Sequence, residues 1–91
     1  MSEILICESN ILENSYKYFL VEKVCDIESI GKSIRYGIKV NSYNKNGRIT
    51  DTKTIYDVFG NKRKMIKAID ILMKLKVTPI TLEDVVIDNI Y

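Results

Sequence analysis

Residues 61–76 constrain the fold more than any other stretch of the chain. They read Asn-Lys-Arg-Lys-Met-Ile-Lys-Ala-Ile-Asp-Ile-Leu-Met-Lys-Leu-Lys. On a helix, where each residue turns the chain by about 100°, the apolar side chains of this segment fill one arc of about 220°. A helix that lies on a single surface needs an apolar arc of only about 100°. We therefore expect the rest of the chain to cover this helix from two directions, with a sheet on one side and a short acidic helix on the other.

Residues 16–59 predict the sheet. Apolar side chains fall on both faces of residues 16–25, which is typical of a central strand. Residues 26–33 break this pattern and predict a loop. Residues 34–42 alternate strictly, as a strand with one buried face does. The first strand carries Tyr16, Tyr18, Leu20 and Val24 on one face and Phe19, Val21 and Cys25 on the other, and the second turns Ile34, Tyr36, Ile38 and Val40 inward.

The dipeptide Asn46-Gly47 predicts a hairpin, because both residues tolerate positive φ. The next strand is interrupted on its apolar face by Asp51 and Lys53. Either the outer half of the hairpin projects into solvent or a bulge shifts the register, and we favour the solvated outer half. Residues 55–59 then return to the core. A two-residue turn at Asn46-Gly47 sets a register with two opposed pairs, Ile38 with Ile55 and Val40 with Lys53.

Capping residues predict the helix boundaries. Asn61 is a suitable N-cap for the central helix over 61–76. Thr78 followed by Pro79 fits the start of a second helix over 79–90. Residues 1–15 form an N-terminal segment that can include a short strand at 3–7. The sequence thus predicts a single α+β domain over 1–91, with a three- to four-stranded antiparallel meander followed by two C-terminal helices packed on one face.

The sequence offers little for catalysis. It contains no histidine, the commonest general base and metal ligand. Glycine-rich phosphate loops, nucleophile elbows and zinc-ligand spacings are absent. We interpret Cys7 and Cys25 as buried free thiols, with a disulfide between them left open. We therefore expect no catalytic residue, no cofactor and no metal site, and the lack of a signal peptide or a long apolar run predicts a cytoplasmic protein away from membranes.

Charge is unevenly distributed. Residues 61–76 hold six Lys/Arg and one Asp, and residues 77–91 hold three acidic residues and no basic one. The acidic residues of the last helix fit a solvated face. The basic side chains of the central helix form a basic ridge that can contact phosphates, although Asp70 interrupts it. These candidates for anion or nucleic-acid contact are Lys62, Arg63, Lys64, Lys67 and Lys74.

Other side chains predict contact with a protein partner. The chain has six tyrosines, and tyrosine is enriched at protein interfaces because it combines apolar area with a polar tip. The last helix also carries a second apolar stripe away from its main one. The chain has more apolar side chains than one small core can bury, which predicts association with itself or with another protein. The candidate partner-binding residues are Tyr43, Tyr56, Ile80, Ile87 and Tyr91.

Three motifs resemble those of a known family. Residues 16–22 read Tyr-Lys-Tyr-Phe-Leu-Val-Glu, residues 35–38 read Arg-Tyr-Gly-Ile, and Val-Thr-Pro at 77–79 precedes Leu82-x-Asp84-Val-Val-x-Asp88. This set resembles an uncharacterised small α+β domain family of spore-forming Gram-positive bacteria, whose pattern is YYLVE, YGI, and Ser/Thr-Pro followed by L-x-D-V-V-x-D. Members of that family often carry a histidine where this chain has Thr81. The resemblance implies a cytoplasmic bacterial domain and brings no activity with it.

We therefore expect a non-enzymatic protein-interaction or regulatory module that associates with itself or with another protein. The alternative is a nucleic-acid-binding accessory protein that uses the basic ridge.

Overall fold

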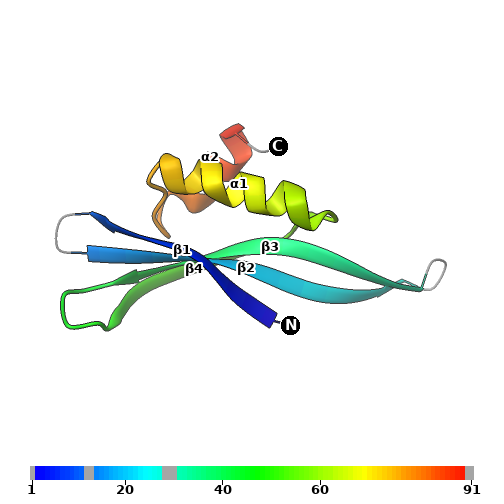
Figure 1. The fold of residues 1–91 in the computed structure, drawn as a ribbon, viewed down its shortest axis with the longest axis horizontal. Coiled ribbons are helices and arrows are strands. Elements are labelled where there is room, and N and C mark those ends of the chain that lie inside the picture. Colours follow the sequence, from blue (N-terminus) through cyan, green and yellow to red (C-terminus); the bar gives the residue numbers. More distant parts are fainter. Residues whose placement is uncertain (1, 12–13, 28–30, 90–91) are drawn as a thin grey trace.

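The computed structural model describes residues 2–11, 14–27 and 31–89 of the chain. Four strands precede two helices (Figure 1). Each strand pairs antiparallel with the next in the order β1-β2-β3-β4, so β1 and β4 are the edges of the sheet. The α+β meander is therefore confirmed, with four strands. The elements are β1 (Ser2–Ile11), β2 (Asn14–Ile27), β3 (Gly31–Tyr43), β4 (Ile49–Phe59), α1 (Lys62–Lys74) and α2 (Leu82–Asn89).

The core lies between one face of the sheet and the two helices, which both lie on that face (Figure 1). Because side chains alternate along a strand, every second residue of β2 and β3 points toward the helices. The buried residues that the sheet contributes are Tyr16, Tyr18, Leu20, Ile38, Val40 and Val58. Those of the helical part are Met65, Ala68, Ile69, Leu72, Val77, Leu82 and Val86.

The two central strands pair further than the sequence indicates. Their register continues to the pair Ile27 and Gly31, so the predicted loop over 26–33 is wrong at both ends, and residues 28–30 lie outside the described part. The hydrogen-bond ladder continues here because pairing between backbones does not require an apolar alternation. β1 likewise extends well beyond the predicted strand at 3–7, with a register shift between Leu5 and Cys7.

The sheet is longer than the helical layer that covers it. The molecule measures 49 × 25 × 19 Å, and the sheet extends past the helices at both ends (Figure 1). Val24 and Ile34, which pair with each other near one end, are therefore exposed although the sequence pattern places them on the apolar face. At the other end, residues 49–53 of β4 are all exposed, as predicted for the outer half of the hairpin, whereas Asn41 and Ser42 of the facing β3 are buried.

The predicted register of this hairpin is confirmed, but the two-residue turn is wrong. The N–H of Asn44 donates to the carbonyl of Arg48 and the N–H of Gly47 to the carbonyl of Asn44, both at 3.0 Å. Gly47 has a φ of 80°. A turn followed by a residue in the left-handed region gives a three-residue loop with a bulge. A register shift between Ser42 and Tyr43 accommodates this bulge, and the opposed pairs remain Ile38 with Ile55 and Val40 with Lys53.

α1 begins where the sequence predicts and ends earlier. The side-chain oxygen of Asn61 accepts a hydrogen bond of 3.1 Å from the N–H of Lys64, so Asn61 is the N-cap. The last helical residue is Lys74 rather than residue 76. Lys76 has a φ of 55°, in the left-handed region that ends a helix.

Two hydrogen bonds close the end of α1. The N–H of Lys76 donates to the carbonyl of Met73 at 2.9 Å, and the N–H of Val77 donates to the carbonyl of Leu72 at 3.2 Å. This pair of bonds is the Schellman motif, which usually has glycine where this chain has Lys76. Because a lysine gives no sequence signal for such a cap, the predicted end at residue 76 was too late.

α2 is shorter than the predicted helix over 79–90. Its first α-helical hydrogen bond runs from the N–H of Val85 to the carbonyl of Thr81 at 3.0 Å. Thr78 and Thr81 cap each other before it: the hydroxyl of Thr81 accepts from the N–H of Thr78 at 3.0 Å, and the hydroxyl of Thr78 accepts from the N–H of Thr81 at 3.4 Å. The turn that follows Thr78 thus delays the helix to Leu82, and Ile90 lies outside the described residues.

The register separates the two cysteines, whose side chains lie outside the description. Cys7 pairs with Tyr18, which is seven positions before Cys25 along β2. At about 3.3 Å per residue the two backbones are about 23 Å apart, whereas a disulfide needs Cα atoms within about 7 Å. Cys7 and Cys25 of one chain therefore do not form a disulfide in this fold.

Candidate protein-interaction surface

The outer side of α1 exposes apolar side chains. Ile66, Ile71 and Leu75 are 37%, 47% and 51% exposed, so the prediction that this helix is covered along its whole apolar arc is wrong. α2 lies beside the edge strand β4, where Glu83, Val86 and Ile87 line a groove. Ile66 and Ile71 instead line a groove with Ile6 of β1. The second helix therefore leaves the β1 side of α1 uncovered.

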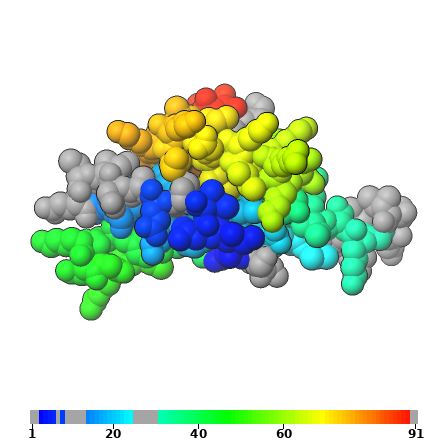
Figure 2. Space-filling model, in the orientation of Figure 1, coloured from blue at the N-terminus to red at the C-terminus, as the bar shows by residue number. Residues whose placement is uncertain are grey.

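One groove is lined by α1 and by a residue of β1. Its volume is about 530 Å³. Figure 2 shows this side of the molecule, with α1 in yellow above β1 in blue. Most of the lining side chains are apolar, a composition typical of a site that receives apolar groups. The lining residues are Ile6, Ile66, Lys67, Asp70, Ile71 and Met73.

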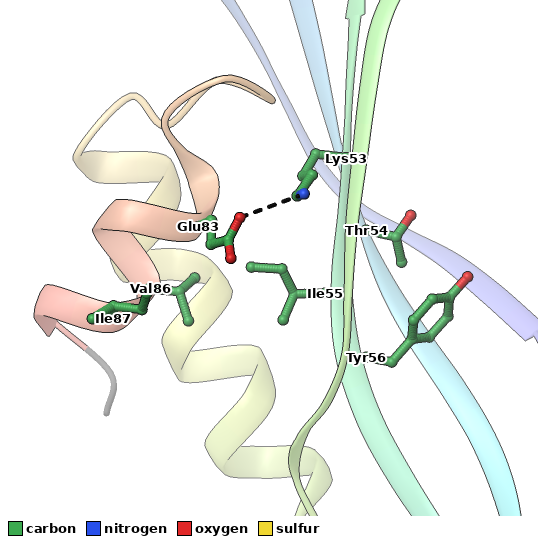
Figure 3. A pocket seen from close by; sticks show the side chains of 7 residues that line it. All are labelled: Lys53, Thr54, Ile55, Tyr56, Glu83, Val86 and Ile87. Atoms are coloured by element: carbon green, nitrogen blue, oxygen red, sulfur yellow. Dashed lines mark ion pairs between the residues drawn. The ribbon is translucent and has the colours of Figure 1, made fainter.

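A second groove of about 360 Å³ lies between the edge strand β4 and α2. In Figure 3, Lys53 and Ile55 point toward α2, whereas Thr54 and Tyr56 point to the opposite face of the sheet. The Nζ of Lys53 lies 3.5 Å from Oε2 of Glu83, which forms an ion pair across the groove. The groove therefore has a charged rim at one end and an apolar wall formed by Ile55, Val86 and Ile87.

The predicted partner-binding residues fall at different places. Ile80 and Ile87 are 82% and 53% exposed, and Ile87 lines the groove between β4 and α2. The Tyr56 side chain points to the opposite face of the sheet (Figure 3). Tyr43 lies apart from them: it is only partly exposed, and the Nδ2 of Asn41 donates a 3.0 Å hydrogen bond to its hydroxyl. Tyr91 lies outside the described residues. The fold thus does not bring Tyr56, Ile87 and Tyr43 together at one site.

The basic ridge is partly neutralised. The Nζ of Lys62 lies 3.6 Å from a carboxylate oxygen of Glu22, and the Nζ of Lys74 lies 2.9 Å from one of Asp70. Exposed pairs of this kind contribute about 0–1 kcal/mol each. Within residues 2–11, 14–27 and 31–89, the members of the ridge that have no acidic partner are Arg63, Lys64 and Lys67.

The described residues show no arrangement for metal binding. No group of three or more Cys, Asp or Glu side chains converges among them. A third pocket near the β3–β4 turn is more polar, and in it the hydroxyls of Ser42 and Thr50 lie 3.1 Å apart. Asp51 supplies its one carboxylate. Neither described helix has the length and apolar character that a membrane crossing requires.

A protein-family model matches residues 2–91, almost the whole chain. The chain belongs to the family of unknown function DUF6514. No curated protein and no solved structure was found to match it. The expected membership of a family of unknown function is therefore confirmed. The description of DUF6514 carries no activity, ligand or partner.

In this DUF6514 chain, the sheet face away from the helices carries lysine–aromatic contacts that sequence reasoning missed. A lysine Nζ lies within about 6 Å of each ring centroid, the range of a cation–π contact. The register of β2 with β3 would have indicated one of these contacts, because Phe19 and Lys39 are opposed residues of the two strands. The three contacts are Lys17 with Tyr43 at 5.0 Å, Lys23 with Tyr56 at 5.8 Å and Lys39 with Phe19 at 5.9 Å.

Proposed function

We propose that this protein is a non-enzymatic protein-interaction or regulatory module that associates with a second copy of itself. The observation that carries the proposal is that five large aliphatic side chains of the helical layer are left exposed, at several places around it. Soluble monomers rarely expose extended apolar patches, and such patches mark association sites. The side chains concerned are Ile66, Ile71, Leu75, Ile80 and Ile87.

The absence of catalysis is part of the same proposal. The sequence has no histidine. The two grooves beside the helices are lined mainly by apolar side chains, and of their charged residues Lys53, Glu83 and Asp70 form surface ion pairs. A catalytic site would instead need an acid, a base or a nucleophile placed within hydrogen-bond distance of a common point. Cytoplasmic location and a host among spore-forming Gram-positive bacteria, both implied by the motif resemblance, are also proposals.

Size-exclusion chromatography with light scattering on the full chain tests the proposal. Across the micromolar range, the mass should rise from 10.5 kDa toward twice that value. The double variant Ile80→Gln plus Ile87→Gln should shift this rise to higher concentration without changing the circular dichroism spectrum, because both side chains are exposed. The control Lys64→Gln alters an exposed polar residue on α1 and should leave the curve in place. If the wild type, the double variant and the control gave the same dependence of mass on concentration, Ile80 and Ile87 would not be part of the interface.

Nucleic-acid binding is the second candidate. It is supported by the three exposed cations without an acidic partner in the described part of the chain, Arg63, Lys64 and Lys67. A contact with phosphates should weaken steeply with salt, because each contact releases counterions. Binding to unrelated duplex DNA or single-stranded RNA should then be lost in Arg63→Glu plus Lys67→Glu and kept in Lys45→Glu, at the β3–β4 turn. Equal binding by both variants would exclude the ridge.

A further inference from the structure

The edge strand β4 has a charge pattern that is complementary to itself. Its sequence from 49 to 55 reads Ile-Thr-Asp-Thr-Lys-Thr-Ile, which is symmetric about Thr52 except that Asp51 on one side matches Lys53 on the other. When two such strands pair antiparallel with Thr52 opposite Thr52, each Asp51 faces the Lys53 of the other copy. Opposite charges at facing positions stabilise a strand pair, and like charges destabilise it.

The fold leaves this strand free to pair. Within the part of the chain that the structure describes, β4 pairs with β3 on one side and with no strand on the other. Residues 49–53 are exposed, and the ladder to β3 is regular from Asp51 to Ile55. Figure 3 looks onto this edge, with α2 to one side of the strand. Unpaired N–H and C=O groups on such an edge are a template for another strand.

Asp51 and Lys53 lie on the same face of the sheet, because they oppose Ser42 and Val40 of β3. Lys53 already forms an ion pair with Glu83, whereas Asp51 has no cationic partner among the described residues. Among the described residues, the one hydrogen bond that its carboxylate accepts comes from the N–H of Thr52, at 2.9 Å. A facing Lys53 from a second copy would supply the missing cation.

We infer that two copies of this chain associate through β4, with Thr52 on the two-fold axis and Asp51 of each copy opposite Lys53 of the other. The two sheets then form one continuous sheet of eight strands. A lysine on an edge usually discourages pairing. Here the order Asp51-Thr52-Lys53 favours pairing with a second copy in this register, because each charge then faces an opposite one. A partner strand without that order would leave Asp51 or Lys53 facing no opposite charge.

The other edge of the sheet does not offer the same pattern. β1 has a register shift between Leu5 and Cys7, which breaks the regular ladder. Its exposed carboxylates, Glu3 and Glu8, are already paired with Lys39 and Lys17 of the same chain. β4 rather than β1 is therefore the edge that pairs with a second copy. This interface rests on the self-association proposed above.

A charge exchange tests the inference. Lys53→Asp alone places two carboxylates opposite each other at both symmetric positions, so the dimer dissociation constant should rise about tenfold. Asp51→Lys alone places two lysines opposite each other and should have a similar effect. The double variant Asp51→Lys plus Lys53→Asp exchanges the charges and should restore the dissociation constant to near the wild-type value. Since the double variant also lacks the Lys53–Glu83 ion pair, its recovery cannot come from contacts within one chain.

Cross-linking tests the register independently. In a background with Cys7→Ser and Cys25→Ser, Thr52→Cys should oxidise to a disulfide-linked dimer, because facing residues of an antiparallel pair have Cα atoms about 4.5–5.5 Å apart, within disulfide range. The matched variant Thr54→Cys should not, since its two copies are about 13 Å apart along the strand. Thermal unfolding of each variant shows whether the monomer fold survives.

The outcomes separate the inference from the proposed function. A wild-type dimer would leave self-association standing, but the β4 interface would be overturned if Thr52→Cys cross-linked no more than the Thr54→Cys control and the charge exchange gave no recovery. A wild-type chain that stays monomeric would overturn both. Cross-linking of the Thr52→Cys variant together with recovery in the double variant supports the inference.

Discussion

The hydroxyl of Tyr18 donates a 2.7 Å hydrogen bond to the backbone carbonyl of Val77, and both residues are buried. Tyr18 lies in the middle of β2, and Val77 lies in the link between α1 and α2. This contact joins the centre of the sheet to the point where the chain turns from one helix to the next. It fixes the position of α2 because it holds the residue that follows the cap of α1.

Tyr18→Phe should destabilise the fold without changing its shape. The ring still fills the core, but the Val77 carbonyl loses a buried donor, and a buried group left without its partner costs about 1–3 kcal/mol. In urea unfolding, the midpoint should fall while the slope stays constant. Tyr56→Phe, at an exposed position, is the control and should leave the midpoint unchanged. Equal midpoints for wild type and Tyr18→Phe would contradict the assigned role of this bond.

Gly37→Ala should destabilise the sheet. A Cβ at this position of β3 would overlap the carbonyl oxygen of Ile55, an atom of the β4 backbone that cannot rotate away. We expect a loss of at least about 2 kcal/mol, as for overpacking in a core. Gly60→Ala is a matched control, because its added Cβ would meet only the end of the Arg35 side chain, at 2.6 Å. Similar stabilities for the two variants would show that β3 and β4 are not this close.

Lys76→Gly should stabilise the protein. Lys76 has a φ of 55° at the end of α1, where a residue with a Cβ is strained and glycine is not. The expected gain is about 0.5–1 kcal/mol. Lys67→Gly, on the exposed side of the same helix, should change stability in the opposite direction by about 1 kcal/mol. The two signs can be read from thermal midpoints, and a loss of stability in Lys76→Gly would contradict the cap.

Neighbouring residues of α1 should respond very differently to truncation. Leu72 is fully buried, and Leu72→Ala should cost about 2–5 kcal/mol. Ile71 is 47% exposed, so Ile71→Ala should cost much less at a protein concentration low enough to keep the chain monomeric. The unfolding midpoints of both variants check this. A comparable loss from Ile71→Ala under those conditions would mean that this side chain is covered within the monomer.

The sequence predicts those features that depend on local chemistry or on strict periodicity. Asn61 has the side chain that an N-cap needs. The alternation in residues 34–42 predicts which face of β3 is buried, and the turn residues Asn46-Gly47 predict its register with β4. It did not predict features that depend on backbone pairing or on unusual φ. The end of β2 and the start of β3 pair without an apolar pattern. Lys76 adopts a positive φ, a conformation that the sequence usually signals with a glycine.

The sequence predicts that isoleucines contribute to an exposed apolar surface, but it does not predict where on the fold that surface lies. Exposed isoleucines on the last helix were expected from the second stripe of that helix, whereas Ile66 and Ile71 were expected to be covered. Their exposure depends on where α2 lies: it packs beside β4, so the side of α1 that faces β1 stays uncovered. The complementary order of Asp51 and Lys53 became meaningful only once β4 was known to be an edge strand.

Sedimentation equilibrium of the wild-type chain at several micromolar concentrations tests the central claim most directly. Self-association predicts that the weight-average mass rises with concentration from 10.5 kDa toward twice that value, and that one monomer–dimer constant fits all rotor speeds. A mass that stays at 10.5 kDa over the whole range would contradict the claim that this protein pairs with a second copy of itself.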